Sequence, residues 1–300
     1  MAGGRMAREA ETLAVLGAGA MGSGMARSAL RAGLPTIVWD RDIERASALA
    51  EAGAEISPTA AQAASRAGIV ITMVTDADAV MSVATEQGML DALVPDSIWV
   101  QMSTIGVVGT ERVMSVVADQ RGDVHLLDAP VSGSTQPAER GELTIFASGS
   151  EDVRPRVTPV FDALGRRTVW VGPLGAGTSM KLVNNTLLAF TNEGVVASIA
   201  LAHRLGLDTK TVLDALQGGP LVSLWESAKF ERIARDDYSA EFALALALKD
   251  VHLALAAVDG SSFEALQGLA REWERVVAGG LGDQDLTVVE RALETGGATR

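Results

Sequence analysis

Short apolar runs alternate with amphipathic segments through the first half of the chain, beginning at Thr12. Each run is rich in Val, Ile, Leu or Thr, which is typical of strands buried on both faces of a parallel sheet. The runs predicted as strands are Thr12–Leu16, Thr36–Trp39, Ile69–Val74, Ile98–Gln101, His125–Leu127, Leu143–Ala147 and Thr168–Val171. The segments between them have helical spacing. The pattern therefore predicts βαβ units with right-handed crossovers in an α/β fold with a doubly wound sheet.

The second half of the chain has a different pattern. After Gly172-Pro173-Leu174-Gly175 come long stretches rich in Ala and Leu with helical spacing, and no strand-like run follows. We therefore expect three parts: a loose leader over residues 1–11, a sheet domain over 12–173, and an all-helical domain over 174–300 that begins with a long interdomain helix.

Composition and charge narrow the functional classes. The 300 residues include no cysteine, which excludes disulfides, thiolate nucleophiles and cysteine-ligated metals and favours a reducing compartment, with the cytoplasm as the expectation. With 38 acidic and 25 basic residues and no basic cluster, we expect no nucleic acid partner. No apolar run is long enough to predict a membrane span. The three histidines lack metal-ligand spacing, so no metal site is predicted.

A glycine motif stands directly after the first predicted strand. Gly17-Ala18-Gly19-Ala20-Met21-Gly22 has the form G-x-G-x-x-G and opens a helix that we expect to end near Arg31. In dinucleotide-binding folds the first glycine permits a tight turn, the second lets the backbone approach the pyrophosphate, and the third allows close packing of the helix. Free N–H groups at the helix start then bind the phosphates. Gly17, Gly19, Met21 and Gly22 are thus candidate cofactor residues in a Rossmann domain.

The residues after the second predicted strand bear on which dinucleotide binds. Asp40 ends that strand, 18 positions after Gly22, where a carboxylate accepts hydrogen bonds from the ribose hydroxyls and repels a 2′-phosphate. Arg41 follows it and would attract such a phosphate. We favour NAD, because repulsion at close range is hard to overcome, and we leave NADP open.

Four ordered motifs resemble the β-hydroxyacid dehydrogenase family, which includes 3-hydroxyisobutyrate dehydrogenase and tartronate semialdehyde reductase. They are Gly17-Ala-Gly-Ala-Met-Gly-Ser-Gly-Met-Ala26, Asp128-Ala-Pro-Val-Ser-Gly133, Gly177-Thr-Ser-Met-Lys-Leu-Val-Asn-Asn185 and Phe242-Ala-Leu-Ala-Leu-Ala-Leu-Lys-Asp250. The resemblance implies hydride transfer between a small β-hydroxy acid and NAD(P), which gives a semialdehyde or keto acid.

The resemblance also implies that Lys181 is the catalytic acid/base, with Asn185 as a second catalytic residue. Oxidation of an alcohol needs a group that takes the hydroxyl proton as hydride leaves, and lysine can serve where burial and nearby positive charge favour its neutral form. Asn184 and Asn185 lie three and four residues after Lys181, hence on the same helical face. Such polar groups on an apolar helix need partners, and a substrate would be one.

Other family positions carry weaker expectations. Ser132 and Gly133 match the residues that bind the substrate carboxylate, and Ser134 stands where the family usually has glycine. The further candidates are Asn184, Trp225 and Phe242 for the substrate, and Val74, Thr75, Thr104 and Lys249 for the cofactor. The helical domain has more apolar surface than it can bury alone, so we expect a homodimer or homotetramer through it.

Two alternatives stay open beside this reading. One is an imine reductase, which shares the fold and cofactor motif but usually has Asp or Tyr where Lys181 stands. The other is a catalytically silent NAD(P)-binding module, which should have lost the lysine and asparagine that this chain retains. The sequence does not identify the substrate beyond a small carboxylate.

Overall fold

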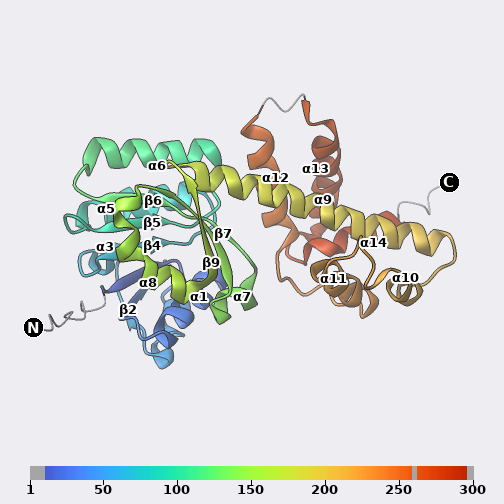
Figure 1. Cartoon of the computed structure of the whole chain (residues 1–300), viewed down its shortest axis with the longest axis horizontal. Helices are drawn as coiled ribbons and strands as arrows, with labels where there is room; N and C mark the ends of the chain where they lie inside the picture. The colour runs from blue at the N-terminus through green and yellow to red at the C-terminus, as the bar shows by residue number, and fades with distance from the viewer. Residues whose placement is uncertain (1–10, 259–261, 296–300) are drawn as a thin grey trace, which may run out of the picture. The chain divides into compact units, whose positions relative to one another are not determined.

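The computed structural model describes residues 11–258 and 262–295 and divides them into two compact units (Figure 1). The N-terminal unit is Met1–Lys181 and the helical unit is Leu182–Arg300. The division falls inside one long helix, later than the boundary expected after Pro173. Of the predicted leader, residues 1–10 lie outside the described residues, whereas Glu11 forms a two-point ion pair with Arg156, at 2.7 and 2.9 Å.

One nine-stranded sheet organises the N-terminal unit, with the order β3-β2-β1-β4-β5-β6-β8-β7 and with β9 paired to β8. The six neighbouring strands β3-β2-β1-β4-β5-β6 all run parallel to one another. The strands are β1 Leu13–Leu16, β2 Thr36–Trp39, β3 Glu55–Ile56, β4 Ile69–Thr72, β5 Ile98–Gln101, β6 His125–Asp128, β7 Val131–Ser132, β8 Leu143–Gly149 and β9 Gly165–Gly172. All seven predicted strands are present, and the doubly wound α/β fold is confirmed.

Helices cover both faces of the sheet. Alternate residues of a strand point to opposite faces, so Leu13 and Val15 join one apolar cluster while Ala14 and Leu16 join another. The first cluster includes α1 and α8, and the second includes α3, α5 and α6. The helices of this unit are α1 Ala20–Arg31, α2 Ile43–Ser47, α3 Ala60–Ala64, α4 Ala77–Met81, α5 Met89–Ala92, α6 Gly106–Gln120, α7 Thr135–Arg140 and α8 Arg154–Leu164. Short π and 3₁₀ turns η1 (Ala50–Ala52), η2 (Ser82–Glu86) and η3 (Glu151–Val153) complete it.

The sheet is not parallel throughout, a detail that the apolar runs did not predict. β8 runs antiparallel to both β6 and β7. A parallel return needs a crossover long enough to retrace the strand, and the short segment between β6 and β8 contains only β7 and the six-residue α7. The two-residue strands β3 and β7 were missed because they are too short to show periodicity.

The helical unit contains no strand among its described residues and has its own core. Its helices are α9 Ala176–Arg204, which begins in the N-terminal unit, then α10 Thr209–Leu216, α11 Leu224–Ala234, α12 Leu244–Ala256, α13 Glu264–Val276 and α14 Val289–Thr295, with turns η5 Val277–Leu281 and η6 Leu286–Val288. Buried Trp273, Phe230 and Val196 belong to one apolar cluster in this unit. No described helix carries an apolar stretch that could cross a membrane.

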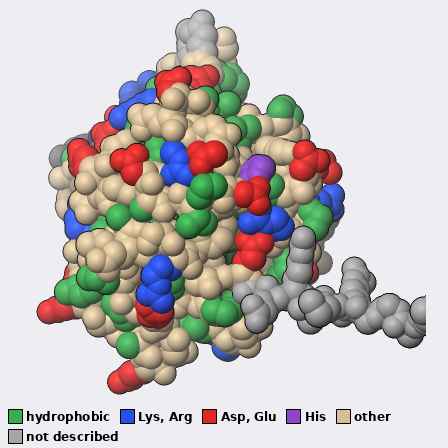
Figure 2. All heavy atoms as spheres, turned by 90° about the vertical axis from the view of Figure 1, so that its left-hand side faces the viewer, with side chains coloured by type: hydrophobic (Ala, Val, Ile, Leu, Met, Phe, Trp, Pro, Cys, Tyr) green, Lys and Arg blue, Asp and Glu red, His purple; other side chains and the backbone are tan. Residues whose placement is uncertain are grey.

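Charged side chains of both signs are interspersed on the face of the molecule drawn in Figure 2. Among the described side chains on that face, no broad area of positive charge stands out. This distribution agrees with the acidic balance of the sequence, at a formal net charge of −13.

Candidate active site

The turn between β1 and α1 requires glycine at two positions. Gly17 has φ +109°, a conformation that side chains rarely adopt, and a Cβ there would lie 2.3 Å from the Met73 carbonyl oxygen. A Cβ on Gly22 would lie 1.8 Å from the Gly17 carbonyl oxygen. These contacts agree with the roles expected for the first and third glycines, a tight turn and close helix packing.

Gly19 differs, because nothing in the chain requires a glycine there. Its φ is −67°, and an added Cβ would meet no protein atom within 4 Å. The first turn of α1 has no side-chain cap, so its N–H groups are available to a ligand, and Met21 in that turn packs on the core. A backbone position without a side chain, next to free N–H groups, leaves room for the pyrophosphate of a dinucleotide, which these residues would bind.

Asp40 joins the glycine turn to the end of β2. Its Oδ2 accepts the Ala18 N–H at 2.6 Å, and its Oδ1 accepts the Asp42 N–H at 2.8 Å. A carboxylate has further acceptor positions, so Asp40 can still bind ribose hydroxyls. Arg41 is exposed beside it. The residues expected to select the dinucleotide thus lie together at the carboxyl end of β2.

A buried polar clamp fixes the loops after β4 and β5. Ser103 is fully buried; its Oγ accepts the Val74 N–H at 2.8 Å, and its own N–H donates to Gln101 Oε1 at 2.7 Å. The Gln101 amide donates back to the Ser103 carbonyl at 2.8 Å. The clamp holds Val74 beside exposed Thr75 and places half-buried Thr104 next to Ser103. Gln101 and Ser103 were not among the predicted site residues, although polar residues at a buried strand end were a usable signal.

Asp128, at the end of β6, anchors the start of α9. Its Oδ2 accepts the Thr178 N–H at 2.7 Å, and its Oδ1 accepts the Thr178 hydroxyl at 2.9 Å. Ser148 Oγ accepts the Gly177 N–H at 2.9 Å. Burial raises the pKa of the Asp128 carboxyl, against the hydrogen bonds from Thr178 and Ser148, which lower it. Two of the four motifs therefore meet here, and this contact between them was not predicted from the sequence.

Close approach explains the glycine that opens the third motif. A Cβ on Gly177 would lie 2.4 Å from the Phe146 carbonyl oxygen and 2.6 Å from the Asp128 carbonyl oxygen. Only glycine lets the first turn of α9 approach the ends of β6 and β8 so closely.

Ser132, Gly133 and Ser134 follow one another from β7 into α7. Ser132 pairs with Thr144 of β8, and Gly133 is exposed with φ +134°. Ser134 has φ −104°, an ordinary value for a side-chain-bearing residue, so serine replaces the family glycine without backbone strain. Its carbonyl accepts the Ala138 N–H at 3.1 Å. The substitution therefore changes the chemistry of this turn and leaves its backbone conformation unstrained.

Lys181 lies one turn after Thr178 in α9 and is 9% exposed. Because Asp128 fixes Thr178 at the carboxyl edge of the sheet, Lys181 lies close to the edge where α/β sheets bind ligands. Asn184 and Asn185 follow it in the same uninterrupted helix. The predicted common helical face of these three residues is thus built.

A polar chain in the helical unit links α9 to α12. Asn184 Nδ2 donates to Asn185 Oδ1 at 2.9 Å, and Asn185 Nδ2 donates to Asp250 Oδ2 at 2.5 Å. Lys249 Nζ lies 2.9 Å from Asp250 Oδ1. Asn185 and Asp250 are each 4% exposed, so the amide of Asn185 is held at both ends. Asp250 was not among the predicted site residues, although it ends the fourth motif.

Phe242 and Trp225 lie elsewhere in the helical unit, and both are half-buried. Phe242 borders a gap too narrow to hold a water molecule, together with Asn185, Leu188, Trp273 and Leu286. Trp225, in the first turn of α11, packs against the core of the unit. The structure therefore brings Phe242 to Asn185 and places Trp225 on a neighbouring helix.

Each unit thus gathers part of the predicted site. The carboxyl edge of the N-terminal unit brings together the glycine turn, Asp40, the β4 and β5 loops and the Asp128 anchor before Lys181. The helical unit gathers Asn184, Asn185, Lys249 and Phe242. No group of three or more His, Cys, Asp or Glu side chains suited to a metal occurs among the described residues. The chemistry available is anion binding by backbone N–H groups, hydrogen bonding by amides, and proton transfer by a buried amine.

Two family models cover the chain. Residues 12–172 match the model of the NAD binding domain of 6-phosphogluconate dehydrogenase. Residues 175–293 match the model described as NAD-binding of NADP-dependent 3-hydroxyisobutyrate dehydrogenase.

Full-length relatives agree with these models. Glyoxylate/succinic semialdehyde reductase 1 of Arabidopsis thaliana is 29% identical over 93% of this chain and 97% of its own length. The NAD-dependent L-serine dehydrogenase of Pseudomonas aeruginosa is 31% identical over 94% of this chain and 97% of its own length. A Mycobacterium tuberculosis 3-hydroxyisobutyrate dehydrogenase structure with L-serine is 27% identical with TM-score 0.84, covering 95% of this chain and 99% of that one.

The chain is also similar to proteins with other names. Imine reductase from Myxococcus stipitatus covers 93% of this chain and 99% of its own, with TM-score 0.66 and 20% identity, so it shows the fold alone. The human cytokine-like nuclear factor N-PAC is 29% identical over 92% of this chain, which spans only 50% of that protein. The full-length relatives are dehydrogenases and reductases of small acids. The chain belongs to the β-hydroxyacid dehydrogenase family and is an NAD(P)-dependent dehydrogenase.

Proposed function

We propose that the chain transfers hydride between a small β-hydroxy acid and NAD, giving a semialdehyde or keto acid, with Lys181 as general acid/base. The observation that carries the proposal is the placement of Lys181, a buried lysine one turn beyond the Asp128 anchor and one turn before Asn184 and Asn185. Nicotinamide, when bound, accepts the hydride in oxidation and returns it in reduction.

The roles of the other residues follow from their chemistry. The neutral amine of Lys181 takes the hydroxyl proton as the substrate carbon loses hydride, and the ammonium returns that proton in reduction. Asn185 Nδ2 donates one N–H to Asp250, and its second N–H is the donor that we assign to the substrate. Ser132 and Gly133 offer a hydroxyl and a backbone N–H to the substrate carboxylate.

Replacement of the lysine tests the mechanism. Lys181→Ala should lower kcat at least about a hundredfold while the Kd of NADH stays unchanged, because the acid/base is lost and the cofactor residues are intact. Lys210→Ala is the matched control, since that side chain is 80% exposed in an ion pair with Asp214. Near-normal turnover by Lys181→Ala would refute the assignment.

The substrate side group is proposed only as far as a small carboxylate. Kinetics on a panel of β-hydroxy acids and semialdehydes, for wild type and Ser134→Gly, would measure how Ser134 selects among them. We expect Ser134→Gly to change relative KM values and to leave cofactor affinity unchanged. An identical substrate ranking in both proteins would exclude Ser134 from the pocket.

For the cofactor we favour NAD over NADP. Asp40 keeps a negative charge where a 2′-phosphate would lie, and its two backbone hydrogen bonds hold it there. The expected result is a kcat/KM for NADH well above that for NADPH. A strong preference for NADPH would reverse this assignment and give the selecting role to Arg41.

We further propose that the N-terminal unit binds the cofactor and that the helical unit binds the substrate and forms a homodimer or homotetramer. The support is a row of exposed apolar side chains along α9 and directly after it: Val183, Leu187, Phe190, Leu201 and Leu205 are 40–69% exposed. Light scattering should show an oligomer that Leu187→Glu dissociates, and a monomeric wild type would contradict the proposal.

We propose the cytoplasm as the compartment of the protein, and the absence of cysteine from the sequence supports this proposal.

A further inference from the structure

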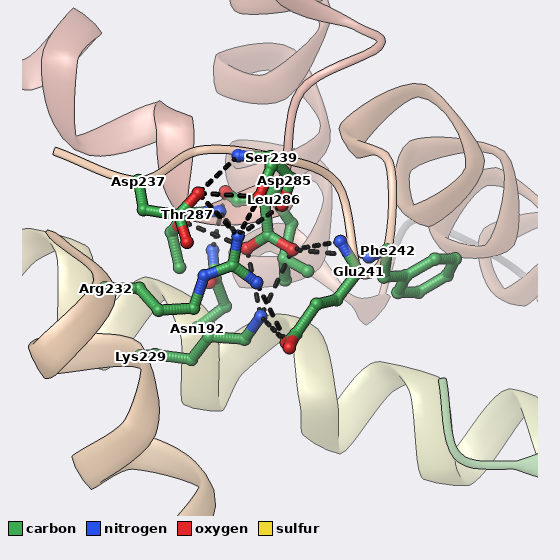
Figure 3. A network of polar contacts seen from close by, with 10 residues as sticks. All are labelled: Asn192, Lys229, Arg232, Asp237, Ser239, Glu241, Phe242, Asp285, Leu286 and Thr287. Atoms are coloured by element: carbon green, nitrogen blue, oxygen red, sulfur yellow. Dashed lines mark hydrogen bonds and ion pairs between the residues drawn. The ribbon is translucent and has the colours of Figure 1, made fainter. Parts of the chain in front are cut away.

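A buried ion cluster lies in the helical unit (Figure 3). Its centre is Asp285, which is fully buried directly before η6. Lys229 of α11 is 3% exposed, and its Nζ lies 3.0 and 3.1 Å from the two Asp285 oxygens. The Thr287 hydroxyl donates to Asp285 Oδ1 at 2.9 Å. The cluster thus joins α11 to the segment before α14.

The same carboxylate holds the backbone that leads into α12. Asp285 Oδ2 accepts the Glu241 N–H at 3.1 Å and the Phe242 N–H at 3.3 Å. In return, the Phe242 carbonyl accepts the Leu286 N–H at 3.0 Å. Phe242 is therefore held at its N–H by the Asp285 carboxylate and at its carbonyl by the residue that follows Asp285.

Lys229 also reaches an aromatic ring and a second acid. Its Nζ lies 5.5 Å from the centroid of the Trp225 ring, one turn earlier in α11, which is within range of a cation–π contact. The same ammonium donates to Glu241 Oε2 at 2.9 Å. Arg232 Nη1 lies 3.1 Å from that oxygen. One ammonium group thus connects Trp225 with the segment that carries Phe242.

The cluster also contacts α9, the helix that carries Lys181. Asn192 of α9 is fully buried, and its Nδ2 donates to the Leu286 carbonyl at 3.1 Å. Leu286 and Phe242 border the same narrow gap as Asn185. A displacement of Asp285 would therefore reach the surroundings of Asn185 through both Phe242 and Leu286.

We propose that Lys229 is a positioning residue for the substrate: its ammonium group holds Trp225 directly and Phe242 through Asp285, and so sets the shape of the aromatic wall against which the substrate side group packs. This inference rests on the proposed function and on the expectation from the sequence that Trp225 and Phe242 contact the substrate. It adds a residue that touches neither substrate nor cofactor and that acts on substrate selection.

Stability alone is a weak reason for such a cluster. Burial of an ammonium and a carboxylate has a large desolvation cost, and apolar side chains of similar volume often give an equally stable core. An ion cluster is directional where an apolar contact is not, because one ammonium can hold two carboxylates and a ring in fixed relative positions. The geometry around Lys229 uses all three of these contacts.

The test measures KM and kcat for the β-hydroxy acid and the Kd of NADH in Lys229→Met. We expect KM to rise about tenfold with kcat within about threefold of wild type, since binding of the substrate is weakened and the proton-transfer group is untouched. The Kd of NADH should stay unchanged. Lys210→Met is the matched control, because its exposed ion pair with Asp214 contacts none of these residues, and it should leave all three constants unchanged.

Two further measurements separate positioning from stability. Lys229→Met combined with Asp285→Asn removes both charges, so the unfolding temperature should recover relative to Lys229→Met while KM stays raised. A double-mutant cycle with Trp225→Leu should be non-additive in KM, because the lysine acts through that ring. A KM that recovers with the unfolding temperature, or additive effects in the cycle, would overturn the inference and leave Lys229 a purely structural residue.

Fluorescence keeps the test independent of turnover. The emission of Trp225, taken as wild type minus Trp225→Phe, should change in Lys229→Met, since the ammonium is removed from the ring. Unchanged emission would overturn the inference. A wild-type chain that turns over no hydroxy acid would instead refute the proposed function, and a changed emission would then still support the control of the ring by Lys229.

Discussion

The two units hold their candidate site residues by different means. In the N-terminal unit the positions are set mainly by backbone: Gly17, Gly22 and Gly177 stand where any Cβ would collide, and Asp40, Ser103 and Asp128 accept main-chain N–H groups. In the helical unit they are set by side chains that hold other side chains, such as Asn185 on Asp250 and Lys229 on Asp285.

The difference shows how each unit tolerates change. A backbone-built site has few acceptable residues at its close contacts, because the space there is smaller than a methyl group. A site built from side chains can be rearranged by exchange of both partners, and its shape can follow the substrate. The first arrangement suits a cofactor shared across the family, and the second suits substrates that differ.

The largest expected effect is a contrast between two glycines of the same turn. Gly22→Ala should lower the free energy of unfolding by more than about 4 kcal/mol or prevent folding, since its Cβ would overlap the Gly17 carbonyl. Gly19→Ala should leave stability within about 0.5 kcal/mol and raise the Kd of NADH at least about tenfold. Chemical denaturation and cofactor titration measure the pair. Equal losses of stability in both would show that the ligand does not determine the glycine at position 19.

An intermediate effect is expected at the helix anchor. Asp128→Ala leaves the Thr178 N–H and hydroxyl without their acceptor in a buried place, so the free energy of unfolding should fall by about 2–4 kcal/mol. Asp128→Asn, which keeps an acceptor oxygen, should lose less than half as much. Denaturation of the two variants checks this. Equal losses would mean that the charge of Asp128 matters more than its hydrogen bonds.

The smallest effect is expected at Glu193 of α9, where a substitution should stabilise the chain, whereas the two preceding substitutions destabilise it. Burial raises the pKa of this carboxyl, and the charge of Glu272 raises it further. A raised pKa in the folded state means that this group favours folding at low pH and loses that contribution as pH rises through its folded value. Glu193→Gln should therefore stabilise the chain by less than about 1 kcal/mol at neutral pH, given partial solvation.

Thermal unfolding over a pH series measures the Glu193 effect. The difference between Glu193→Gln and wild type should vanish below the ordinary glutamate pKa of 4.5, where both proteins are uncharged at this position. The Trp273 Nε1, which donates to Glu193 Oε2 at 3.2 Å, keeps an acceptor in the glutamine variant. A difference that grows toward low pH would contradict the assigned sign.

The sequence predicted most of the N-terminal unit because its requirements are local. Gly17, Gly19 and Gly22 appear as a motif, and the strands appear as apolar runs, since each depends on neighbours in sequence. The antiparallel return of β8 was not predictable in this way, because strand direction depends on how the short segment after Asp128 folds.

The side-chain pairs of the helical unit were also not predictable, because their members lie far apart in the sequence. Asp285 follows Lys229 by 56 positions, and Asp250 follows Asn185 by 65. No periodicity links such pairs, and a buried lysine in an amphipathic helix is indistinguishable in sequence from one on its solvent-facing side. The Asp128 contact with Thr178 joins two motifs that were each found, yet the bond between them required the fold.

The carboxylate of Asp40 constrains how coenzyme preference can change during evolution or redesign. Exchange of NAD for NADP is commonly sought by removal of the acidic residue at this position, but here the same residue accepts the Ala18 N–H inside the glycine turn. A small uncharged replacement would admit a 2′-phosphate and at once leave that turn without its acceptor. A lineage that switched coenzyme would need a second change to restore the lost hydrogen bond. Coenzyme preference and the conformation of the glycine turn would therefore evolve together.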